Sequence, residues 1–203
     1  MIKSISIKNF RSIKDSLVLD MERSGRKKSE LYNYRNSGNF ELALSTVIYG
    51  ANASGKSNVL KAFKALEYLV LHSSRFDPES KINPYEPFRL SVNSKEKPVE
   101  IELDFFTDSI RYVYTVHFTL QRIEFERLVF YPNGREALLF ERKAAEEMDF
   151  GQYFQGEKKA IEKLTLPNQL FLSKAASNNA ESCLPVFQFF KSGLRIFPFL
   201  YPH

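Results

Sequence analysis

The chain has 203 residues, of which 43% are apolar and 14% aromatic, so it is long enough to fold around a buried core. Its single cysteine excludes an internal disulfide, and its longest helical apolar run is interrupted by Glu67 and is far too short for a membrane span. Because a secretory leader pattern is also lacking, we expect a cytoplasmic protein with no membrane partner.

The net charge of +5 comes from the first 40 residues, which carry nine Lys and Arg against four Asp and Glu. Part of this excess is a run formed by Arg23, Arg26, Lys27 and Lys28. Two interpretations stay open for this run: a solvated loop, or a loop that faces DNA and neutralises phosphates.

The amino-terminal part predicts three strands. Residues 2–8 alternate strictly between apolar and polar, which is the period of a half-buried strand, and a second short strand is expected over 16–21. After a polar excursion over 22–39, the apolar run 43–49 predicts a strand that is covered on both faces.

The remainder of the chain predicts a helix, an antiparallel meander and a mixed end. Apolar residues at helical spacing indicate an amphipathic helix over 56–71, and the proline-containing stretch 72–98 is expected to be a connection. Four strands with tight turns follow, the last turn carrying Asn133-Gly134; they are expected at 99–106, 111–120, 123–131 and 136–142. Short helices are expected near 157–164 and 181–191, with a strand at 169–173 between them.

The segment between the third strand and the first helix carries the clearest chemistry. Residues 50–57 read Gly-Ala-Asn-Ala-Ser-Gly-Lys-Ser, which matches G-x-x-x-x-G-K-S/T at every required position. Two glycines allow backbone N–H groups to converge on phosphate oxygens, and the following helix adds the positive end of its dipole. The pattern therefore predicts a nucleoside triphosphate site whose residues are Gly50, Asn52, Ala53, Ser54, Gly55, Lys56, Ser57 and Asn58.

Three of these side chains have predicted roles. Lys56 is expected to reach the β and γ phosphates and to serve catalysis, Ser57 to ligate Mg²⁺, and Asn58 to touch the α phosphate. The motifs that a GTPase uses to read guanine and to switch do not occur in the sequence. A small-molecule kinase remains an alternative, although such enzymes do not normally place two strands and forty residues before the P-loop strand.

With these residues in view, the chain resembles the amino-terminal half of an SMC/RecF-type ATP-binding-cassette ATPase. It is similar in particular to the AAA-labelled ATPases of bacterial abortive-infection and other anti-phage systems. The matching pieces are the opening Ile5-Ser6-Ile7-Lys8-Asn9-Phe10-Arg11-Ser12-Ile13-Lys14, the loop 50–58, Pro87-Phe88-Arg89-Leu90, the stretch 123–142, and Leu170-Phe171-Leu172-Ser173 followed by Ala175-x-x-Asn178.

The resemblance implies an α/β fold of the ABC/SMC-head class of P-loop NTPases. Such a head has a mixed sheet with the P-loop helix beneath it and an antiparallel β subdomain. The whole chain would be the first lobe of an incomplete head, divided into 1–71 (strands and P-loop), 72–98 (connection), 99–142 (meander) and 143–203. By the same resemblance, Arg11 lies beside the nucleotide and contacts phosphate or the base.

The chain also departs from the family pattern. Family members place a glutamine between Mg²⁺ and the attacking water, and here only Gln169 is available near the corresponding segment, with Ser173 as a substitute. A signature motif and a downstream Walker B pair are missing, and the stretch around Asp20 imitates a Walker B but precedes the P-loop. The fragment alone is therefore expected to bind ATP and Mg²⁺ but to turn ATP over poorly.

The resemblance implies a function and partners as well. The complete protein would hydrolyse ATP in a head-to-tail dimer with a second copy of the head, as the sensor or motor of an anti-phage system that controls an effector such as a nuclease. Two alternatives stay open: an ATPase of DNA repair or chromosome maintenance that contacts DNA, and a module in which ATP locks an assembly without being hydrolysed.

Other chemistry-bearing residues predict no second site. His72, His117 and His203 are scattered, without the Cys or carboxylate neighbours of a metal site. Glu124 and Glu126 are expected on one strand face and are best explained as solvent-facing charges. The phenylalanine-rich end, with Phe187, Phe189, Phe190, Phe197 and Phe199, is too apolar for a free tail and is expected either to pack on the sheet or to meet a further part of the protein.

Overall fold

The computed structural model describes residues 1–23, 33–52, 54–144 and 146–196. Most strands join one seven-stranded sheet in the order β2-β1-β5-β6-β7-β8-β9. Their bounds are β1 Ile2–Lys8, β2 Leu17–Asp20, β5 Val99–Thr107, β6 Ile110–Phe118, β7 Ile123–Tyr131, β8 Ala137–Lys143 and β9 Asp149–Phe150. A separate two-stranded sheet is formed by β3 Tyr34–Ser37 and β4 Phe40–Ala43.

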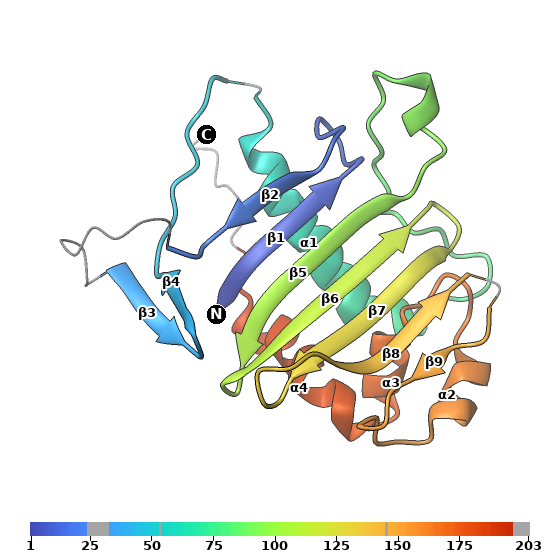
Figure 1. Cartoon of the computed structure of the whole chain (residues 1–203). Helices are drawn as coiled ribbons and strands as arrows, with labels where there is room; N and C mark the ends of the chain where they lie inside the picture. Colours follow the sequence, from blue (N-terminus) through green and yellow to red (C-terminus); the bar gives the residue numbers. More distant parts are fainter. Residues whose placement is uncertain (24–32, 53, 145, 197–203) are drawn as a thin grey trace.

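The helices lie on one face of the large sheet, which Figure 1 shows from its other face. The long helix α1 Lys56–His72 runs behind the strands, and the shorter α3 and α4 lie beside it. The remaining helical elements are η2 Ser73–Arg75, η3 Val92–Ser94, α2 Lys158–Leu164, α3 Phe171–Ser177, η4 Glu181–Cys183, α4 Leu184–Gln188 and the π-turn η5 Phe189–Gly193.

Apolar alternation explains how the sheet and the helices close on one core. Ile5 and Ile7 of β1 are fully buried, and so are every second residue of β5 and β6 over much of their length. On α1 the buried residues recur at helical spacing: Val59, Ala62, Phe63, Ala65, Leu66, Leu69 and Val70. The predicted first strand, P-loop helix and meander are thereby confirmed, with bounds that differ by at most two residues.

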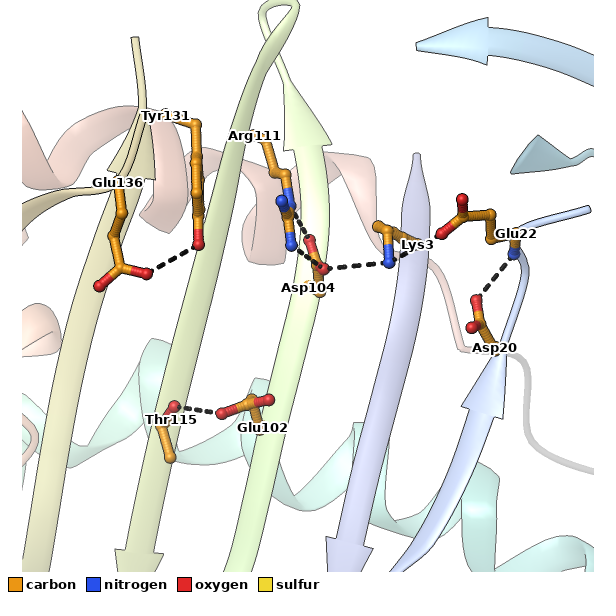
Figure 2. A network of polar contacts seen from close by, with 9 residues as sticks. All are labelled: Lys3, Asp20, Glu22, Glu102, Asp104, Arg111, Thr115, Tyr131 and Glu136. Atoms are coloured by element: carbon orange, nitrogen blue, oxygen red, sulfur yellow. Dashed lines mark hydrogen bonds and ion pairs between the residues drawn. The ribbon is translucent and has the colours of Figure 1, made fainter. Parts of the chain in front are cut away.

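The other face of the sheet is polar (Figure 2). Asp104 accepts two hydrogen bonds from Arg111, at 2.9 and 2.7 Å, and lies 3.6 Å from the Lys3 ammonium. Lys3 also pairs with Glu22 at 3.1 Å. The positive charges of Lys3 and Arg111 are therefore balanced by Asp104 of β5 and by Glu22, which follows β2.

Three predictions about strands are wrong. All described strand pairs of the large sheet are antiparallel, so the described residues contain no mixed sheet. The strand expected over 43–49 does not form; the observed strand β4 covers 40–43 and ends at Ala43, which pairs with Tyr34 of β3. Beyond it the backbone has no described strand partner and leaves Val47 and Tyr49 exposed by 67% and 87%. The strand expected over 169–173 is instead the start of α3.

The carboxyl-terminal part packs against the sheet, as one of the two predictions for it stated. Phe189 and Phe190 are buried, and the ring of Phe189 stacks on Phe105 of β5 at 4.2 Å between centroids. Phe197, Phe199 and His203 lie outside the described residues. Cys183 is fully buried in the same layer, and burial raises the pKa of its thiol. No helix within the described ranges is long and apolar enough to cross a membrane.

Candidate nucleotide-binding site

The P-loop leads directly into α1. Gly55 is the residue before the helix and adopts φ 95°, a left-handed conformation that glycine takes without strain. No described side chain caps this end of α1 by hydrogen bonding. The N–H of Asn58 donates to the carbonyl oxygen of Gly55 at 2.8 Å. The N–H groups of Lys56 and Ser57 precede it and have no partner within the helix, so this end of α1 offers donors and positive dipole charge to an anion.

Both glycines of the motif stand where a side chain would collide. A Cβ atom on Gly50 would lie 2.8 Å from the Ser54 hydroxyl, and one on Gly55 would lie 2.5 Å from the Ser12 hydroxyl. The backbone is thus left bare at both of these positions. This bare backbone fits the close approach of phosphate oxygens.

Lys56 crosses the loop. Its ammonium group donates hydrogen bonds to the carbonyl oxygens of Gly50 and Ala51, at 2.8 and 2.6 Å. The charge therefore sits where the loop would surround a phosphate group. Residues 54–58 line a hollow of about 170 Å³ beside it.

The residues also fit a magnesium ion in the way that P-loops usually hold it. Ser57 is exposed on the first turn of α1. No three or more His, Cys, Asp or Glu side chains gather into a metal site within the described ranges. Magnesium that keeps most of its waters needs only one protein oxygen beside the nucleotide phosphates, and the exposed Ser57 hydroxyl is available for that position.

The structure brings Arg11 to the P-loop helix. The Nε atom of Arg11 donates to Oδ1 of Asn58 at 3.0 Å, and Nη1 forms an ion pair with Glu86. Asn58 is the third residue of α1, so the guanidinium lies beside the first turn of the helix. Asn52 and Ser54 are exposed on the loop, and Ala53 lies outside the described residues.

Gln169 and Ser173 are not brought to the P-loop. The amide of Gln169 donates to the carbonyl oxygens of Ser74 and Phe76, and Ser173 accepts from the N–H of Ser74. These partners follow the carboxyl end of α1. The helix has 17 residues, so at 1.5 Å per residue its two ends are about 25 Å apart. Both side chains therefore have structural roles in this arrangement, and the role beside the metal does not fit them.

The expectation for the paired glutamates is half wrong. Glu124 is partly exposed and pairs with Arg122 at 2.8 Å, but Glu126 is completely buried. β7 has a bulge at Glu124: His117 pairs with Phe125 and the next residue, Phe118, pairs with Ile123, so Glu124 has no pairing partner on β6 and the register shifts. Two residues that a regular strand would place on one face are thereby separated.

The carboxylate of Glu126 caps α3. It accepts hydrogen bonds from the N–H groups of Phe171 and Leu172, at 2.6 and 2.9 Å, and from the Tyr114 hydroxyl at 2.8 Å. Burial raises the pKa of this carboxyl group more than nearby Arg142 and the three donors lower it. Glu126 is thus a structural group far along the chain from the P-loop.

Three residues at the site were given no individual role by the sequence analysis. Ser12 accepts a hydrogen bond from Asn58, and Glu86 forms an ion pair with Arg11. Asn9, which is buried, lies in the same turn as Arg11 and hydrogen-bonds to Phe88 and Ser94. The sequence signals were indirect: Asn9 and Ser12 belong to the Asn-Phe-Arg-Ser segment that carries the resemblance, and Glu86 directly precedes the matching piece 87–90. In the basic run, Arg23 pairs with Glu41 at 3.0 Å and stacks over Tyr34, and residues 26–28 lie outside the described ranges.

The comparisons with known proteins agree with the P-loop. No curated protein matches the chain. Residues 45–187 match the model of a family described as "AAA domain, putative AbiEii toxin, Type IV TA system". The match spans well over half of the chain and contains the whole motif from Gly50 to Asn58. The chain belongs to this family of P-loop AAA domains.

Proposed function

We propose that the chain is the ATP·Mg²⁺-binding lobe of an SMC-like cassette ATPase, whose complete form hydrolyses ATP between two copies of the head. The observation that carries the proposal is the P-loop itself: bare glycine backbone, an uncapped helix start and the Lys56 ammonium meet at one place. Membership of the AAA family supports a nucleotide as the ligand.

The roles of the chain's own residues follow from this geometry. The backbone of residues 50–57 binds the phosphates, and Lys56 exchanges its two carbonyl partners for phosphate oxygens. Ser57 holds Mg²⁺, which when bound supplies charge stabilisation to the phosphate being transferred. Because Gln169 lies beyond the opposite end of α1, the group that orients water must come from elsewhere, and this favours completion of the site by a second copy.

The biological role rests on the resemblance and on the family description. We propose that the assembled ATPase acts as a sensor or motor of a bacterial anti-phage system and controls an effector. A role in DNA maintenance would require a basic surface. The open sheet face described above pairs Arg111 and Lys3 with carboxylates, so it does not favour this second role.

The test is equilibrium binding of a fluorescent ATP analogue with and without Mg²⁺. Lys56→Ala is expected to weaken binding at least tenfold. Lys61→Ala, which removes a lysine from the next turn of the same helix, is the matched control and is expected to change binding little. Ser57→Ala is expected to bind nucleotide but to lose the gain that Mg²⁺ gives the wild type.

The rate of ATP hydrolysis tests whether the 203-residue chain forms only part of the ATPase site. The 203-residue chain is expected to release phosphate slowly or not at all while binding ATP. Fast turnover that Lys56→Ala abolishes would contradict the incomplete-head proposal. Equal binding by the wild type, Lys56→Ala and Lys61→Ala would reject the nucleotide site itself.

A further inference from the structure

The turn that carries Arg11 has an unusual and tightly fixed backbone. The N–H groups of Phe10 and Ile13 each donate to the carbonyl oxygen of the other, both at 2.8 Å. Asn9 and Arg11 adopt φ values of 53° and 55°, which non-glycine residues rarely do. Such conformations persist only where the surroundings hold them, and they are frequent at functional sites.

Asn58 joins this turn to the P-loop helix by both ends of its amide. Oδ1 accepts from Nε of Arg11 at 3.0 Å, and Nδ2 donates to the Ser12 hydroxyl at 2.7 Å. A guanidinium group can only donate hydrogen bonds, so Oδ1 must face Arg11 and the amide has one orientation. Oδ1 and one of the two Nδ2 hydrogens of Asn58 are therefore engaged within the protein, and only the second Nδ2 hydrogen is left for the predicted contact with the α phosphate.

Arg11 is held from its other side as well. Its backbone N–H donates to the carbonyl oxygen of Glu86 at 2.7 Å, and Nη1 pairs with the Glu86 carboxylate. Nη2 takes part in none of the hydrogen bonds found among the described residues. The guanidinium is thus fixed beside the first turn of α1 with one amino group left to donate. A planar donor of this kind matches the oxygens of a phosphate group.

We infer that Asn58 is a positioning residue, which acts on the nucleotide only through Arg11. Its amide holds the guanidinium in place, and Ser12 fixes the orientation of that amide. Arg11 itself makes the phosphate contact. This inference rests on the proposed nucleotide site and assigns to Asn58 and Ser12 a role that differs from phosphate contact.

The experiment is a double-mutant cycle on nucleotide affinity. ATP dissociation constants are measured in Mg²⁺ for the wild type, Asn58→Leu, Arg11→Ala and the double variant. A lost hydrogen bond to a charged group is expected to weaken binding about tenfold in each single variant. If Asn58 acts through Arg11, the double variant binds no more weakly than Arg11→Ala alone.

The controls keep the result interpretable. Asn93→Leu changes an exposed asparagine away from these contacts and is expected to leave affinity unchanged. Ser12→Ala retains both partners but frees the amide. It is expected to weaken binding about threefold in the wild type and not at all when Arg11 is already alanine. If Asn58→Leu fails to fold in thermal unfolding, the Ser12→Ala cycle supplies the same comparison.

The outcomes distinguish this inference from the proposed function. Additive losses in the double variant would overturn the positioning role, because Asn58 would then act independently of Arg11. Full affinity in Asn58→Leu would overturn it too. If the wild type itself bound no ATP, the proposed function would fail and the inference with it. If the wild type binds ATP and Lys56→Ala does not, the proposed function is supported whatever the result of the double-mutant cycle.

Discussion

Asn9 is expected to be the most sensitive polar residue near the P-loop. Its side chain is 4% exposed. Nδ2 lies 2.9, 2.9 and 3.1 Å from the carbonyl oxygens of Ser94, Lys97 and Pro98, and Oδ1 accepts from the N–H of Phe88 at 3.1 Å. One amide thus fixes the long connection before β5 onto the turn that carries Arg11.

The cost of Asn9→Ala follows from these contacts. Two amide hydrogens and one acceptor are lost, at about 1 kcal/mol for each hydrogen bond. Alanine tolerates φ 53° less well than asparagine, which adds up to about 1 kcal/mol. The sum is about 3–4 kcal/mol, a large part of the 5–15 kcal/mol that typically stabilises a domain. Asn9→Gly loses the same bonds without the backbone strain and is expected to be about 1 kcal/mol more stable than Asn9→Ala.

Urea unfolding followed by circular dichroism measures these differences. Asn179 provides the matched control because it also has a positive φ, 58°, but is exposed. Asn179→Ala should cost only the backbone strain. If Asn9→Ala were no more destabilising than Asn179→Ala, the contacts of the Asn9 amide would contribute nothing to stability and the reasoning would be refuted.

Three further predictions use the same physical terms. Gly55→Ala is expected to weaken ATP binding more than tenfold, because the new Cβ would lie 2.5 Å from the Ser12 hydroxyl and the residue would have to keep a φ of 95°. In the fluorescent-analogue assay, adding Ser12→Ala removes the contact but not the backbone strain, so it should restore only part of the affinity. Glu126→Ala is expected to lower the free energy of unfolding by about 3 kcal/mol, because three buried donors lose their acceptor, and Glu126→Gln by clearly less; equal urea midpoints for the two would contradict this. Because burial raises the pKa of Glu126, its contribution should be complete below the unfolded pKa of about 4.3 and be lost as pH rises through the folded pKa, so Glu126→Gln should flatten that part of the profile of stability against pH.

Local patterns were sufficient for most of the large sheet. Strict alternation in β1, the turn at Asn133-Gly134 and helical spacing in α1 are properties of short stretches, and each predicted its element closely. The failures depend on distant partners. The apolar run at 170–172 suits a strand or a buried helix, and the helix that forms is capped by Glu126 from 45 residues away, which a local pattern does not reveal.

At the candidate site, too, local motifs could be predicted and contacts between distant residues could not. The P-loop residues form a contiguous motif and were found from the sequence. Arg11 came from the resemblance, and its contact with Asn58 across 47 positions required the structure. Glu86 lies 75 positions from Arg11 and just outside the matching piece 87–90, so its pairing with Arg11 also required the structure. The run 43–49 was predicted as a buried strand because apolar residues usually are buried, but a strand also needs a neighbour to pair with, and the described residues provide none.

The burial of Cys183 has a practical consequence. The only thiol of the sequence is inaccessible and its raised pKa keeps it protonated, so maleimide reagents should leave the native protein unlabelled. A single cysteine introduced by Leu90→Cys, at an 89% exposed position on the connection that Asn9 fixes, would then be labelled selectively while Cys183 is kept. Because the native thiol is buried in the core, a fluorophore can be placed on this connection without first replacing Cys183.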